Sequence, residues 1–110
     1  MNLITDEQKA EWVKALRSGE FKQGRSGLCV GSSDDPHYCC LGVAGVVILK
    51  RNYEELRGGY LRERTDMEYP AEVLLPFYWQ SYLAKKNDIG CSFNEIADII
   101  EKVDFTRFSP

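Results

Sequence analysis

The sequence is poor in the residues that most often form metal sites. It contains one histidine, His37, and none of its four cysteines forms a C-x-x-C pair. Structural zinc sites usually pair ligands that are separated by two to four residues, whereas Cys39 and Cys40 are adjacent. We therefore predict no metal site. No cofactor is predicted either.

The sequence also lacks an excess of basic residues and a long hydrophobic segment. Its formal net charge is −3 and its pI is about 5.2, which argues against sequence-independent binding to nucleic acid. The longest uncharged apolar stretch, residues 38–49, is well short of the roughly 20 residues that span a bilayer. The N-terminus has no pattern of a secretory signal. We expect a soluble, cytoplasmic protein with neither nucleic acid nor membrane as a partner.

Residues 38–49 are what the rest of the chain must be organised around. A stretch of apolar and glycine residues without a charge has to be buried, so the other elements must pack against it. Its β-branched residues are compatible with a strand, but its length favours a helix from about residue 39 to residue 50. We predict that this helix is the centre of the core.

The flanking segments predict helices and a small sheet. Helices are expected at 5–18 and 92–103, each starting with a capping box, and a shorter one at 70–75, ended by Pro76. Segment 21–30 is predicted to form two short strands around a glycine turn, followed by a loop at 32–36. An edge strand is expected at 60–64 and a short helical turn at 82–86. The prediction is one α+β domain, residues 1–110, with a small antiparallel sheet of about three strands packed against a buried central helix and further helices.

The cysteines at the start of the central helix allow two interpretations. In the favoured one, Cys39 and Cys40 are reduced, buried thiols that act as small hydrophobic residues. In the alternative, one of them is the nucleophile of a papain-like cysteine hydrolase, activated by the helix dipole. Because the one histidine lies only two residues before Cys39, it is poorly placed as the general base. No catalytic residue is therefore assigned.

Polar residues near the start of this helix suggest a binding site for an anion. Backbone amides at a helix N-terminus attract negative charge, and the glycine turn at 24–27 would lie beside them. Asn87 and Asp88 would offer exposed polar groups. The candidate ligand-binding residues are Gln23, Arg25, His37, Tyr38, Asn87 and Asp88.

Three segments resemble a family of small uncharacterised proteins encoded by bacteriophages and prophages. They are residues 12–24 (WVKALRSGEFKQG), 38–43 (YCCLGV) and 83–101 (LAKKNDIGCSFNEIADIIE). The resemblance implies an accessory protein that acts in the host cytoplasm. Our leading hypothesis is a non-enzymatic protein that counters host defence by sequestering a small anionic, nucleotide-like signal, with homo-oligomerisation as an option. The alternatives are a protein inhibitor of a host defence nuclease or CRISPR complex, acting through exposed aromatic residues, and the cysteine hydrolase.

Overall fold

The computed structural model describes residues 4–25, 27–56 and 75–105. Along the chain the elements are α1 (Asp6–Arg17), β1 (Cys29–Ser32), β2 (Asp35–Tyr38), α2 (Cys40–Val47), α3 (Tyr53–Leu56), α4 (Phe77–Asp88) and α5 (Phe93–Lys102). The two strands form an antiparallel sheet. The predicted α+β class is confirmed. In the described part of the chain the sheet has two strands, and the strand predicted at 60–64 lies outside that part.

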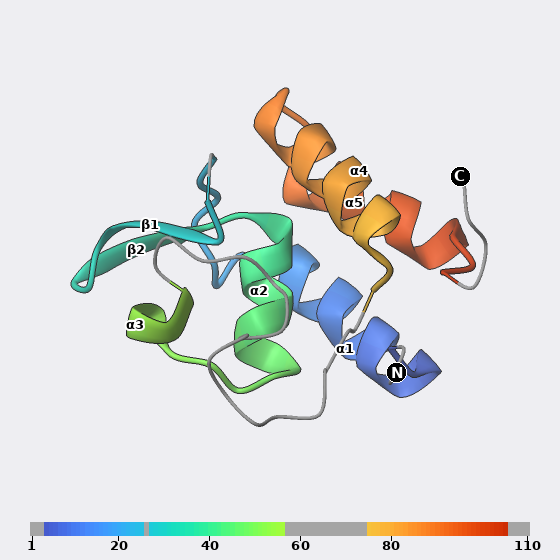
Figure 1. Cartoon of the computed structure of the whole chain (residues 1–110), viewed down its shortest axis with the longest axis horizontal. Helices are drawn as coiled ribbons and strands as arrows, with labels where there is room; N and C mark the ends of the chain where they lie inside the picture. Colours follow the sequence, from blue (N-terminus) through green and yellow to red (C-terminus); the bar gives the residue numbers. More distant parts are fainter. Residues whose placement is uncertain (1–3, 26, 57–74, 106–110) are drawn as a thin grey trace.

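Helix α2 lies in the middle of the molecule, as the apolar stretch predicted. It contacts α1, α4 and β2, with the hairpin on one side and the longer helices on the other (Figure 1). Gly42 brings the helix against the chain that precedes β1, because a Cβ at this position would lie 1.9 Å from the carbonyl oxygen of Leu28. The indole nitrogen of Trp12 donates to the carbonyl oxygen of Cys40 at 2.9 Å, which ties α1 to α2.

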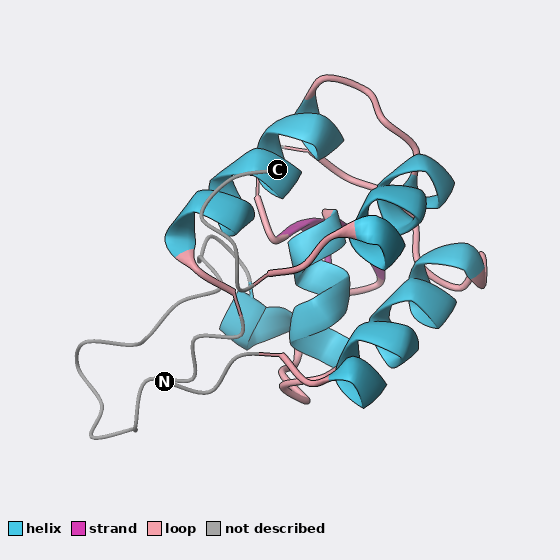
Figure 2. Ribbon diagram, turned by 90° about the vertical axis from the view of Figure 1, so that its right-hand side faces the viewer, coloured by secondary structure: helices cyan, strands magenta, loops and turns pink. Residues whose placement is uncertain are grey.

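Helices α1 and α5 begin where the capping boxes predicted. The hydroxyls of Thr5 and Ser92 each accept a hydrogen bond at 3.1 Å from the backbone amide three residues further on. The two helices pack against each other, and Arg17 joins their exposed edges by donating to Asp98 at 2.6 Å and to Glu101. Figure 2 shows this layer of helices around α2, with the short strands near the centre of the view.

The hairpin differs from the prediction. We expected strands on both sides of the glycine turn at 24–27 and a loop at 32–36, but Ser32 pairs with Asp35 across a two-residue turn, and the second strand continues to Tyr38. Serine and aspartate are common turn residues, and the turn that Ser33 and Asp34 form is much shorter than the predicted loop. The predicted first strand is reduced to one bridge, in which Tyr38 exchanges backbone hydrogen bonds with residues 22 and 24.

Helix α4 also differs from the prediction, in its start and in its length. Pro76 was predicted to end a helix at 70–75, and only a short turn was expected at 82–86. In the structure Pro76 is instead the N-cap of a 12-residue helix that includes the aromatic cluster. A proline suits this place because the first backbone N–H groups of a helix have no partner within it. Residues 70–74 of the predicted helix lie outside the described residues.

The core is formed by buried residues of all the helices and of the hairpin. Phe105, after the end of α5, is buried against Trp12 and Trp79, whose ring centroids lie 6.3 and 5.4 Å away. The cysteines are free thiols, as favoured, and three of the four are buried. None of the described helices has both the length and the apolar character needed to cross a membrane.

Candidate functional site

The N-terminus of α2 is built into the core. Cys39, Cys40 and Leu41 are almost fully buried. The amide of Cys40 donates to the side-chain oxygen of Asn87 at 3.2 Å, and the amide of Gly42 donates to Sγ of Cys39 at 3.4 Å. The amides that we expected to attract an anion are thus hydrogen-bonded inside the protein.

Asn87 is the centre of this buried network. Its side chain is fully buried near the end of α4, although sequence reasoning placed it on the surface. Its Oδ1 accepts from Cys40 and, at 2.9 Å, from Nε2 of Gln23, and its Nδ2 donates to the carbonyl oxygen of Gly24 at 2.8 Å. Gln23 also donates to the carbonyl oxygen of Cys91 at 2.8 Å. Gln23 and Asn87 therefore do lie together, and they join α2, α4 and segment 22–24.

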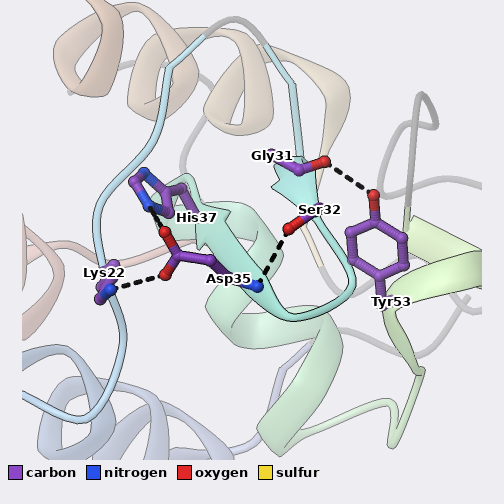
Figure 3. Close-up of polar contacts among 6 residues, drawn as sticks. All are labelled: Lys22, Gly31, Ser32, Asp35, His37 and Tyr53. Carbon is purple, nitrogen blue, oxygen red and sulfur yellow. Dashed lines mark hydrogen bonds and ion pairs between the residues drawn. The ribbon is translucent and has the colours of Figure 1, made fainter.

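His37 and Arg25 lie on the surface instead. His37 is on β2, with Nε2 3.4 Å from Oδ2 of Asp35, and Lys22 approaches the other carboxylate oxygen at 2.5 Å (Figure 3). The pKa of Asp35 is held below its ordinary value mainly by the hydrogen bond from Lys22 and, to a smaller extent, by the hydrogen bond with His37. Arg25 is exposed next to Gly24, whose Cβ position would lie 2.9 Å from His37 Cβ. At this edge the ammonium group of Lys22 and the ring of His37 both contact the Asp35 carboxylate, whose negative charge opposes the approach of an anion.

Tyr38 and Asp88, the remaining predicted site residues, have other neighbours than the Lys22–Asp35–His37 group. The ring of Tyr38 is half-buried and packs edge-on against Phe21 at 5.3 Å, and burial raises the pKa of its hydroxyl. Asp88 is exposed at the end of α4, where Oδ1 lies 3.4 Å from Nδ2 of Asn87. Of the predicted residues, Gln23 and Asn87 thus belong to a buried structural network, and His37 belongs to a separate polar edge.

The cysteine geometry argues against a hydrolase. The thiol of Cys40 is fully buried and donates to the carbonyl oxygen of Leu83 at 3.6 Å. Burial raises the pKa of Cys39 and raises that of Cys40 well above its ordinary value, so both thiols are held protonated. Within the described residues, no group of three histidine, cysteine or acidic side chains is arranged to hold a metal ion.

A different surface stands out on α4. Among the described residues, Tyr78 and Ile89 are the exposed large hydrophobic side chains, at 45% and 66% exposure. At about 100° per residue, Tyr78 and Ile89 lie about 20° apart around the helix, on the side opposite the buried Asn87. The buried Trp79 lies between the two sides, about 80–100° from both. We define the α4 outer face as Tyr78, Ser81, Tyr82, Lys85 and Ile89.

The aromatic rings on the outer face are ordered by their neighbours. The rings of Tyr78 and Tyr82 are nearly parallel, with centroids 6.5 Å apart, and each meets the buried ring of Trp79 edge-on at 5.7 Å. Nζ of Lys86 lies 5.4 Å from the centre of the Tyr82 ring, a cation–π arrangement. Sequence reasoning noted the aromatic residues but not their alignment with Lys85 and Ile89, because it ended the helical turn at 86 and started it only at 82.

A family model described as a domain of unknown function (DUF8296) matches residues 4–82. The match includes α1, the hairpin, α2, α3 and the first half of α4 with both of its tyrosines. No curated protein and no solved structure matches the chain.

Proposed function

This chain belongs to the DUF8296 family, and we propose that it is a non-enzymatic binding protein that contacts a partner protein through the α4 outer face. In a phage-encoded protein the partner would be a host defence factor, such as a nuclease or a CRISPR complex. The proposal keeps the accessory, anti-defence role that the sequence suggested. It changes the place where binding occurs.

The observation that carries the proposal is the alignment of Tyr78 and Ile89 on one exposed helix face. Single exposed hydrophobic residues are common on protein surfaces, but here an exposed isoleucine is aligned with an ordered tyrosine, and tyrosine is enriched at the hot spots of interfaces. Tyrosine contributes a large contact area and loses little side-chain entropy on binding. The neighbouring packing of Trp79 holds both tyrosines in place before a partner arrives.

A second candidate keeps the small anionic ligand and moves it to the same face. Parallel tyrosine rings stack planar bases, and Lys85 beside them would bind a phosphate. This site differs from the predicted one because Gln23 and Asn87 have no part in it. An open face encloses a small molecule less well than a cleft, so we rank this candidate second.

Site-specific photo-crosslinking tests the protein-binding proposal. A benzophenone amino acid replaces exposed Ser81 in the middle of the outer face, and a matched control replaces exposed Lys14 on α1. In cells that make the protein, we expect one discrete adduct from position 81 and none from position 14. The adduct should disappear when Tyr78→Ser and Ile89→Ser are added. No adduct at position 81, or the same adducts from both positions, would contradict the proposal.

Thermal shift with cyclic and ADP-ribose-type nucleotides tests the second candidate. A ligand present at 100 times its Kd stabilises the folded protein by about 2.7 kcal/mol. Stabilisation that is lost with Tyr82→Ala but kept with Lys14→Ser would favour the nucleotide over a protein partner. If no nucleotide changes the melting temperature at millimolar concentration, the second candidate is rejected.

A further inference from the structure

We infer that the partner of the α4 outer face is an acidic, amphipathic protein segment with apolar anchors at both ends and carboxylates between them. This inference rests on the proposed function and specifies its partner. It follows from the order of charged and apolar groups along the face and from the contrast with the other exposed helix surfaces.

The charge of α4 has the opposite sign to that of the chain. Residues 77–88 contain Lys85, Lys86 and Asp88, so their formal charge is 2 − 1 = +1, whereas the whole chain carries −3. In α5 three acidic residues and one lysine give 1 − 3 = −2. An acidic partner is attracted to α4 and repelled by α5, which gives selectivity and faster association more than affinity.

The apolar groups set the length and shape of the partner. Tyr78 and Ile89 are 11 residues apart, which is about 16 Å along a helix at 1.5 Å per residue. Small Ser81 and ordered Tyr82 lie between them, so the middle of the face is free of bulky aliphatic side chains. A three-turn amphipathic helix spans this length and places one apolar side chain near each end. Its central carboxylates would then lie over Lys85.

A second copy of the chain is a poorer occupant of this face. If two α4 helices pair antiparallel about the middle of the face, between residues 83 and 84, Lys85 and Lys86 of both copies lie within one turn of the dyad. The pairing would gather four like charges at the centre of a small interface. An acidic partner would instead neutralise them.

An unbiased peptide selection tests the inference. A random library of 16-residue peptides is selected on the immobilised full-length protein, and the affinities of enriched peptides are measured by fluorescence anisotropy. We expect acidic peptides with apolar residues at helical spacing. Tyr78→Ser with Ile89→Ser should weaken their binding at least tenfold, and so should Lys85→Glu with Lys86→Glu. Lys14→Glu, which makes one such charge reversal on α1, should alter it less than twofold, and Lys85→Glu alone should weaken binding more than this control does.

The possible results distinguish failure of the inference alone from failure of both the inference and the proposed function. If the enriched peptides are basic or uncharged but lose binding to the Tyr78→Ser, Ile89→Ser variant, the inference of an acidic partner is overturned. The proposal that the α4 outer face binds a protein then still stands. Peptides that are insensitive to every α4 variant overturn both. A selection without enrichment also overturns both. Sedimentation that shows self-association, abolished by Tyr78→Ser, would assign the face to a second copy. Melting curves of all variants must remain cooperative, which keeps misfolding from imitating lost binding.

Discussion

Helices α4 and α5 are neighbours of similar length, but they differ in how many of their apolar side chains are buried. In α5 the apolar residues Phe93, Ile96, Ala97 and Ile100 are buried and Ile99 is half-buried, so all of the exposed residues are polar. In α4 the buried side includes the polar residue Asn87, while Tyr78 is exposed and Ile89 follows at its end. Helix α5 therefore has the pattern of a helix that serves the fold. Helix α4 has features that the fold alone does not explain.

The largest difference should come from two isoleucines. Ile96 of α5 is fully buried, so Ile96→Ala should lower the free energy of unfolding by about 2–5 kcal/mol, through lost burial and a cavity. Ile89 at the end of α4 is mostly exposed, so Ile89→Ala should change it by less than about 0.5 kcal/mol. Urea unfolding of both variants measures the contrast. A large loss with Ile89→Ala would mean that the residue supports the fold, and the binding surface would lose its main support.

The next difference concerns two asparagines. Asn87→Ala should cost about 2–4 kcal/mol, because the amide of Cys40 and the carbonyl oxygen of Gly24 would be left buried without this partner. Asn94 is exposed on α5, and Asn94→Ala should cost less than about 0.5 kcal/mol. The same unfolding experiment compares them. Equal, small losses would show that Asn87 is replaceable and that α2 is held by packing alone.

The helix starts provide a smaller contrast. Ser92→Ala removes the hydroxyl that caps α5 and should cost about 1 kcal/mol. At the start of α4, Pro76 makes no side-chain capping bond, so Pro76→Ala removes no such interaction and should cost less. Thermal unfolding of the two variants would test this order. A greater loss at Pro76 would show that its fixed backbone angle, and not a cap, defines the start of α4.

The same two helices show how far the sequence could predict the structure. The start of α5 and its buried face followed from local signals, because a capping box and helical periodicity are both contained in neighbouring residues. Asn87 was misplaced because its burial depends on Gln23, Gly24 and Cys40, which are distant in the chain. The start of α4 after Pro76 was missed because proline is compatible both with the end of one helix and with the start of the next.

The helix N-terminus around which the ligand site was predicted is covered, for a related reason. The apolar stretch correctly indicated a helix that starts near Cys39, and free amides are expected at an isolated helix start. Whether those amides face solvent depends on which element packs over them. In this fold the end of α4 does so through Asn87. The outer face of α4 became recognisable only when Tyr78, Tyr82 and Ile89 were placed on one continuous helix.

The smallest predicted effect is the pH dependence of the link between α1 and α5. Arg17 holds the pKa of Asp98 below its ordinary value of 3.8, chiefly by a hydrogen bond. Because the pKa is lowered in the folded state, the stabilisation is fully present above pH 3.8 and is lost as the pH falls through the folded value. A double-mutant cycle of Arg17→Met and Asp98→Asn should therefore give a coupling at pH 7 that disappears in strong acid. The side chains of Arg17 and Asp98 are 37% and 61% exposed, so solvent reaches the pair and molar salt should reduce the coupling at pH 7. A coupling that persists in strong acid would mean that Arg17 acts by packing its aliphatic stem on α5. The charge of Asp98 would then not help to hold α5 against α1.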